Sequence, residues 1–173
     1  DGEGITTTEI EGSGGYCSGD YTSGFGGTSS ATPLVSGVIA LILEANENLT
    51  WRDVQHILVQ TSRKNDASDS SWNTIVAGYD VSHKYGYGVI DAGAAVRLAE
   101  NWTTVNEEVN TTSGVITLNQ AIPDNTNTPV TDTVTISESI LMESVEVIVD
   151  IDHPYRSDLE IILTSPSGTE SIL

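Results

Sequence analysis

The pattern of apolar and polar positions divides the chain near residue 103 into two regions of different texture. Before that point the sequence predicts a Thr-rich strand at 5–10, then a loop crowded with Gly and Ser at 12–27. A helix is predicted from Thr28, and its apolar residues are too crowded for one stripe. We therefore expect this helix to be buried on most sides and to end at 46–48.

Two further helices are predicted, each with a recognisable start. Thr50 and Asp53 have the spacing of a capping box, with Thr50 as N-cap of the second helix. Asp91 is expected to cap a third helix that runs to Leu98. The expected apolar face of the second helix consists of Trp51, Val54, Leu58 and Thr61. Between the two helices lie a polar connector (63–80) and a short strand or turn (85–90).

Residues 104–173 show no helical period. Apolar and polar side chains alternate around 134–136, 145–151 and 159–163, and a turn sequence follows at 165–168. Repeated runs of period two with turns between them predict antiparallel β structure. Each strand has one apolar face, so we expect a second domain that packs two sheets, with about half of its strands in this chain.

The balance of charges excludes some partners. Six basic and 25 acidic residues give a net charge of −19, which repels nucleic acid and anionic membranes. Such a surface favours cationic partners or tolerates high salt, but it also keeps a secreted protein soluble, and the composition leaves these interpretations open. No run of about 18 uninterrupted apolar residues, the length needed to span a bilayer, occurs.

Ser29 is the main candidate for chemistry, in the run Gly-Thr-Ser-Ser-Ala-Thr-Pro-Leu-Val-Ser-Gly from Gly27 to Gly37. It lies where the glycine-rich loop meets the first helix. The N–H groups of a first helical turn lack partners inside the helix, and an acyl-transfer enzyme needs such donors where an oxyanion develops. The tripeptide Gly-Thr-Ser alone favours a different interpretation, because a Ser or Thr before a helix is usually only an N-cap.

The longer pattern Gly-Thr-Ser-x-Ala-x-Pro, with Ser-Gly at its end, resembles the nucleophile signature of the subtilisin superfamily. Residues 43–56 and 81–93 resemble the kexin/furin proprotein convertases almost residue for residue. Residues 101–105 are similar to the seam between their catalytic domain and P domain. Two further segments, 156–159 and 163–169, resemble the middle of that P domain.

This resemblance implies both fold and function. Residues 1–103 would form the C-terminal part of an α/β subtilisin-like catalytic domain, and 104–173 the N-terminal part of an all-β, jelly-roll-like sandwich P domain. Ser29 would be the nucleophile of a serine endopeptidase that cleaves polypeptides through an acyl-enzyme, after basic residues. The alternative is a non-catalytic secreted β-sandwich module for binding or adhesion, or an inactive protease homologue.

In this superfamily the His and Asp of the triad, and the Asn of the oxyanion hole, precede the serine. They are not in this chain, which we therefore expect to be inactive by itself. None of the three histidines has the family's His-Gly-Thr context, so we expect each to be structural or exposed: His56, His83 and His153.

The resemblance also implies calcium, with most of its ligands outside this chain, and a location in the secretory pathway or outside the cell. It implies that Cys17, the only cysteine, pairs with a cysteine preceding residue 1. The chain departs from the family at Phe25, where relatives have a His, and in a longer loop from Cys17 to Ser29. Both departures put the dibasic specificity of the family in question.

Overall fold

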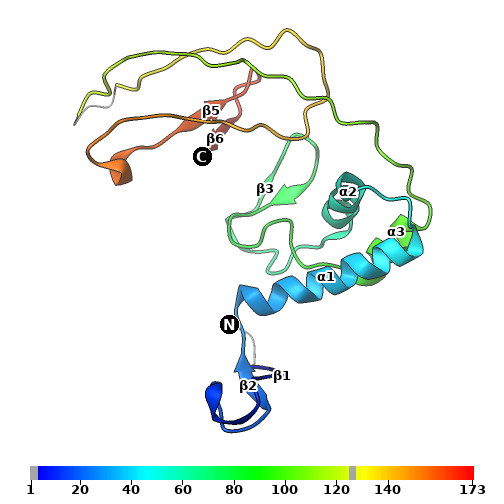
Figure 1. Cartoon of the computed structure of the whole chain (residues 1–173). Coiled ribbons are helices and arrows are strands. Elements are labelled where there is room, and N and C mark those ends of the chain that lie inside the picture. The colour runs from blue at the N-terminus through cyan, green and yellow to red at the C-terminus, as the bar shows by residue number, and fades with distance from the viewer. Residues whose placement is uncertain (1–3, 125–127) are drawn as a thin grey trace. The chain divides into compact units, whose positions relative to one another are not determined.

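The structure, a computed structural model, describes residues 4–124 and 128–173 of the chain. The chain forms two compact units, Asp1–Glu108 and Val109–Leu173. Each unit is described by itself below, and Figure 1 labels their elements.

The first unit begins with a β-hairpin. Strand β1 (Ile5–Thr8) pairs antiparallel with β2 (Tyr21–Phe25), with a bulge between Ile5 and Thr7. A short 3₁₀ helix, η1 (Gly12–Gly14), lies in the connection. The first strand was predicted, but the assignment of 12–27 as loop was wrong. The aromatic residues at the two ends of β2 favour an extended backbone, and β1 supplies the partner that the glycine-rich composition concealed.

Three helices follow, and their ends agree with the predicted signals. Helix α1 (Thr28–Ala45) ends where the Asn46 N–H donates to Ile42 O. Helix α2 (Trp51–Thr61) starts with the predicted capping box at Thr50. Helix α3 (Ala92–Ala99) starts at Asp91, whose carboxylate accepts the Ala94 N–H at 2.9 Å. The starts of all three helices are thus confirmed.

A small core holds these helices together. Both α1 and α2 pack against α3, where alanines allow close approach. The buried apolar residues are Ile42, Leu49, Val54, Ile57, Ala95 and Ala99.

The predicted apolar face of α2 was partly wrong. Val54 is buried as expected, but Trp51 is 65% exposed and the fully buried position is Ile57. The cause is Asp53, a carboxylate with 0% exposure. A binary pattern places a charged residue outside, so it could not predict that hydrogen bonds would hold Asp53 inside and rotate the helix accordingly.

The expectation that α1 is buried on most sides was also wrong. Only Ser30 and Ile42 of this helix are buried, and Leu34 is 66% exposed. Among the described elements α1 packs mainly on α3, so one stripe of the helix is covered and its other apolar positions are not. By length and composition α1 could also cross a membrane, a test that core helices of soluble proteins pass equally.

The segment between α2 and α3 folds back on itself. The predicted connector contains β3 (Asn73–Thr74), which pairs antiparallel with β4 (Asp80–Val81). Two isolated bridges follow, Ser82 with Gly86 and Arg63 with Val89. The second bridge ties the end of α2 to the start of α3.

In the second unit, β5 (Ile162–Thr164) and β6 (Glu170–Ile172) form a hairpin around the predicted turn, with Ile162 opposite Ile172. A 3₁₀ helix, η2 (Arg156–Asp158), precedes it. The strands predicted at 134–136 and 145–151 are not formed, because no described segment supplies the ladder hydrogen bonds that define a strand. The two-sheet sandwich stays a prediction.

Candidate active site around Ser29

Ser29 is the second residue of α1, immediately after the hairpin. Strand β2 ends at Phe25, and the chain enters the helix through Gly26 and Gly27. Gly27 is the N-cap, with φ of +80°, a left-handed conformation that favours glycine. No side chain caps this helix. The capping interpretation of Ser29 therefore fails, because the cap is the glycine two residues earlier.

The adjacent serines Ser29 and Ser30 have opposite environments. Ser30 is buried, and its hydroxyl donates to Gly27 O at 2.7 Å. Ser29 is exposed, and neither its hydroxyl nor its backbone N–H has a hydrogen-bond partner in the described part of the chain. Both groups can thus meet a ligand at the positive end of a helix, where a carbonyl oxygen that gains negative charge is stabilised.

Pro33 lies within α1 and has no N–H to donate to the carbonyl of Ser29. The helix continues unbroken through the proline. Nearby hydroxyls bond back to carbonyls one turn earlier, since Thr32 Oγ1 donates to Thr28 O at 3.0 Å and Ser36 Oγ donates to Thr32 O at 3.2 Å. The effect of Pro33 is therefore limited to one missing hydrogen bond.

Within the first unit, the described structure brings no histidine into hydrogen-bonding contact with Ser29. His56 lies in α2 and stacks on Trp102, with ring centroids 6.4 Å apart. His83 is exposed in the turn after β4, and His153 Nδ1 lies 2.8 Å from Tyr155 O. Neither His56 nor His83 shares a hydrogen bond with Ser29 in the described structure. The expectation that these histidines are structural or exposed is confirmed.

The hairpin that precedes Ser29 carries the two departures from the family. Phe25 is 40% exposed and pairs with Ile5 across the sheet. Cys17 has a free thiol that lies 3.1 Å from Glu9 Oε2 and 3.1 Å from Tyr21 O. Glu9 also accepts the N–H of Tyr16, so this one carboxylate organises the loop. No sequence signal indicated that role, because Glu9 forms part of no motif.

No cluster of three His, Cys, Asp or Glu side chains that could hold a metal occurs in residues 4–124 and 128–173. Two carboxylates of the connector, Asp69 and Asp80, form ion pairs. Lys84 Nζ lies 2.8 Å from Asp69, and its hydrogen bond holds the pKa of that carboxyl well below the usual range. Lys64 Nζ lies 3.0 Å from Asp80, whose pKa is lowered by the Thr74 hydroxyl and by this lysine. These groups do not fit a calcium site.

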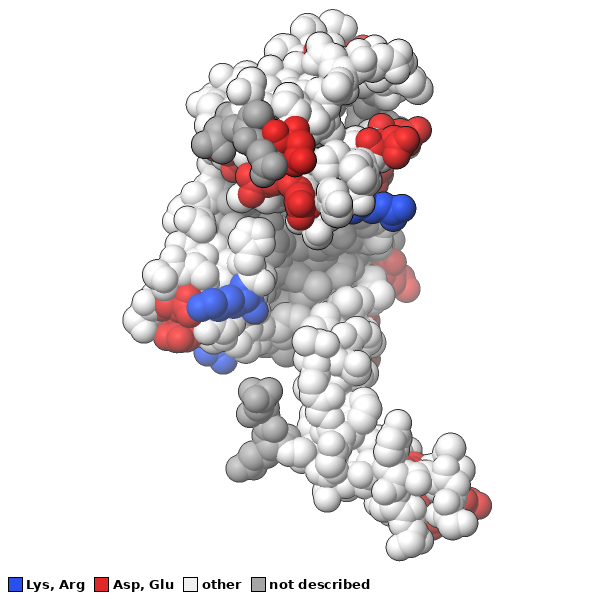
Figure 2. Space-filling view, turned by 90° about the vertical axis from the view of Figure 1, so that its left-hand side faces the viewer, with Lys and Arg blue, Asp and Glu red and all other residues white. Residues whose placement is uncertain are grey.

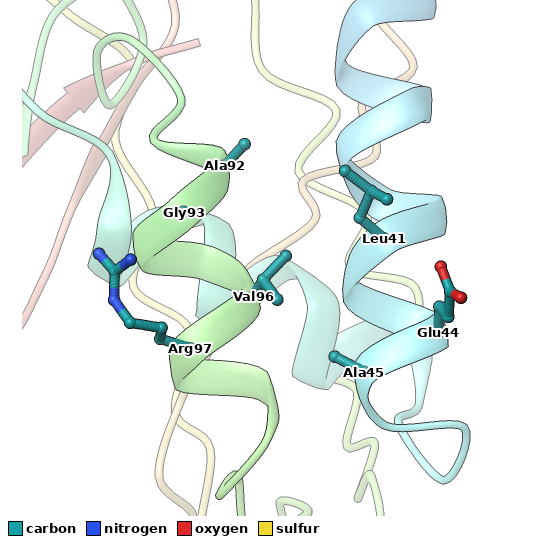
Figure 3. Close-up of a pocket in the computed structure, with 7 residues that line it drawn as sticks. All are labelled: Leu41, Glu44, Ala45, Ala92, Gly93, Val96 and Arg97. Atoms are coloured by element: carbon teal, nitrogen blue, oxygen red, sulfur yellow. The ribbon is translucent and has the colours of Figure 1, made fainter.

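A groove in the described structure lies elsewhere. It lies between α1 and α3, has a volume of about 500 Å³, and is open to solvent. Figure 3 shows Leu41 and Ala45 of α1 directed toward Val96 of α3. Leu41 is twelve residues beyond Ser29, or about 18 Å along the helix. The groove is therefore separate from the candidate nucleophile.

Comparison with known proteins identifies families whose sequences match this chain. Residues 2–88 match the model of the subtilase family, and 142–173 match that of the proprotein convertase P-domain. Proprotein convertase subtilisin/kexin type 5 of Rattus norvegicus is 42% identical over 172 residues, covering 91% of this chain and 9% of that protein. Furin of Homo sapiens is 43% identical over 150 residues, covering 85% and 19%. Neuroendocrine convertase 2 of Bos taurus is 40% identical over 178 residues, covering 98% and 27%.

Among solved structures, the serine protease of Aeromonas sobria aligns with a TM-score of 0.49 and 31% identity, over 52% of this chain and 18% of that one. The chain spans about a tenth to a quarter of the length of the curated relatives named above. The resemblance to the kexin/furin convertases is confirmed, and the chain belongs to the subtilase family.

Proposed function

We propose that this chain is part of a serine endopeptidase that cleaves polypeptides through an acyl-enzyme formed on Ser29. The observation that carries the proposal is the position of this residue in a subtilase-family chain. Ser29 is exposed at the second position of α1, with its hydroxyl and N–H unpaired in the described structure. This arrangement supports attack on a carbonyl carbon by the hydroxyl and stabilisation of the resulting oxyanion by the N–H.

A serine hydroxyl is a weak nucleophile unless a base accepts its proton. In the proposed reaction a histidine oriented by an acidic residue takes the proton from Ser29 Oγ and returns it to the leaving amine. The histidines of this chain do not supply that group. We infer that the base and its orienting acid come from a part of the protein preceding residue 1, so that these 173 residues alone are inactive.

Polypeptides with basic residues at the cleavage site are the proposed substrates. The net charge of −19 supports this class, because it attracts cationic segments. Figure 2 shows that Asp and Glu gather in more places on the displayed face than Lys and Arg. Phe25 introduces an apolar side chain four residues before Ser29. We propose that it adds a preference for apolar residues near the scissile bond.

The same proposal extends to calcium binding, the domain boundary, the fold of the P domain and the location of the protein. Calcium would bind ligands that lie mostly outside this chain, as the family resemblance implies. The boundary between catalytic and P domains would lie near residue 103, and the P domain would be a jelly-roll sandwich. The protein would act in the secretory pathway or outside the cell.

The test is labelling by a fluorophosphonate probe, which reacts with activated serines. The full-length gene product should be labelled, and Ser29→Ala should abolish both labelling and peptide cleavage. Ser36→Ala is the matched control, since Ser36 is an exposed serine of the same helix and should react like wild type. A folded full-length protein that the probe does not label would instead identify an inactive homologue.

The bonding state of Cys17 can be tested separately. The chain has one cysteine, so a disulfide requires a partner outside these residues. We propose that Cys17 pairs with a cysteine preceding residue 1. Peptide mapping of the secreted full-length protein without reduction should find Cys17 in a cross-linked peptide, and a free thiol there would contradict the proposal.

A further inference from the structure

Four hydrogen bonds converge on the carboxylate of Asp53, which is fully buried. Trp102 Nε1 and the Val105 N–H donate to Oδ1 at 2.7 and 2.8 Å. The N–H and the hydroxyl of Thr50 donate to Oδ2, both at 2.7 Å. Oδ2 therefore accepts hydrogen bonds from the start of α2, and Oδ1 accepts them from the segment that follows α3.

An ionised carboxylate satisfies this arrangement fully. Three of the four partners are N–H groups that can only donate, and each carboxylate oxygen faces at least one of them. An asparagine has one oxygen and one NH₂ group, and in either orientation its NH₂ would face at least one N–H donor. The capping box alone does not require this chemistry, because its N3 residue needs only one acceptor oxygen, and an amide side chain such as Gln serves there as Glu does. The second oxygen thus points to a role beyond capping.

That role concerns residues 102–106, the last part of the first unit before its end at Glu108. Besides Asp53, the neighbouring Arg52 holds this segment, because its Nη1 donates to Asn106 O at 2.6 Å. His56 stacks on the Trp102 ring from the next turn of α2. Three residues on one side of α2 therefore fix a segment that has no regular structure of its own.

We propose that Asp53 is a two-sided clamp that ties residues 102–106 to the N-terminus of α2 and thereby protects the connection between the two units from proteolysis. Glu107 and Glu108, directly after the clamped segment, are exposed. A protease must bind several residues on each side of the bond it cuts, in an extended form. The clamp holds the residues that precede Glu107 in place, so that a protease cannot bind them in its active site.

The experiment measures hydrogen exchange of the Val105 N–H and cleavage after Glu107 and Glu108 by a glutamate-specific protease, in the full-length gene product. Asp53→Ala should speed exchange at Val105 at least tenfold relative to Ala99 in α3, with cleavage rising in parallel. Trp102→Phe removes one donor to Oδ1 and leaves the capping side intact. It should change exchange in the same direction, and it decides the matter if Asp53→Ala does not fold.

Two controls separate the clamp from simple helix capping. Asp91→Ala removes the side-chain cap of α3. Thr50→Ala removes the hydroxyl contacts of the α2 cap, while the N–H of residue 50 stays on Oδ2 and both donors to Oδ1 remain. Neither should increase exchange at Val105 relative to Ala99 more than twofold. Unchanged exchange in Asp53→Ala and Trp102→Phe would overturn the proposal. So would an equal effect of Thr50→Ala, because the segment would then merely follow the stability of α2.

Discussion

The backbone of Gly88 lies directly against the carbonyl of Arg63, at a position that has no room for a side chain. A Cβ added at Gly88 would fall inside the contact distance of Arg63 O and C. Gly88 also has φ of +112°, which is unfavourable for other residues. This close approach allows the bridge in which Arg63 N–H donates to Val89 O at 3.0 Å and Val89 N–H donates to Arg63 O at 2.9 Å.

Gly88→Ala should therefore destabilise the protein by about 2 kcal/mol or more, since both backbone strain and a steric clash would result. Urea denaturation measures the change. Gly86→Ala is the control, because Gly86 also has a positive φ but open space at the Cβ position. Its cost should be about 1 kcal/mol. Equal losses in the two variants would show that the clash at Arg63 is relieved.

The observed orientation of α2, which differs from the one expected from the sequence, leads to a second prediction. Ile57→Ala should reduce the free energy of unfolding by about 3 kcal/mol, because Ile57 is fully buried and its truncation leaves a cavity. Trp51→Ala, a larger truncation on an exposed position, should cost under about 1 kcal/mol. The apolar face expected from the sequence alone includes Trp51 and predicts a large loss there, so chemical denaturation of the two variants distinguishes the two orientations of the helix.

These cases show what the sequence could reveal. The helix starts were readable because capping depends on residues three apart, such as Thr50 and Asp53. The signature around Ser29 was readable because it is contiguous. The rotation of α2 was not, because it depends on donors from Trp102 and Val105, about fifty residues away.

The strands were the least predictable elements, for a related reason. Alternation along 145–151 indicates an extended conformation, but a strand also needs a partner, and pairing is a property of two distant segments. Strand β2 was missed for the opposite reason, because its partner β1 compensates for a glycine-rich composition. Local signals thus identified the helix termini and the nucleophile motif, while tertiary partners determined the rest.

The charge of Asp53 makes the stability of the protein dependent on pH. Burial acts to raise its pKa, but the hydrogen bonds from Val105, Thr50 and Trp102 outweigh burial and lower it from 3.8 to about 2. A carboxyl group whose pKa is lower in the folded state stabilises that state at pH values above its pKa in the unfolded chain. That contribution, about 2 kcal/mol, is lost as the pH falls from about 4 to 2.

Urea denaturation at pH values between 2 and 7 tests this dependence. Asp69 also has a lowered pKa, so the wild-type curve alone does not assign the effect. The difference between wild type and Asp53→Asn should be constant above pH 5 and should shrink by about 2 kcal/mol toward pH 2. A difference that is independent of pH would mean that Asp53 titrates normally.

The last prediction concerns residues 104–173 expressed alone. Their described regular elements are one hairpin and a 3₁₀ helix, while apolar side chains such as Val115, Leu141 and Ile148 are more than 90% exposed. A two-stranded hairpin is at best marginally stable in water. We therefore expect this fragment to aggregate or to unfold without a cooperative transition, and to bind a dye that reports exposed apolar surface.

If the domain is a two-sheet sandwich, further strands must cover these apolar faces and pair with the open edges. Extending the fragment by about 70 residues of the gene's own sequence, from typical strand lengths and counts, should then restore a cooperative thermal transition and abolish dye binding. An extension of equal length in scrambled order is the control, and it should restore neither. A monomeric 104–173 fragment with sharp, dispersed amide resonances would contradict the prediction, because such spectra require a packed core that one hairpin cannot provide.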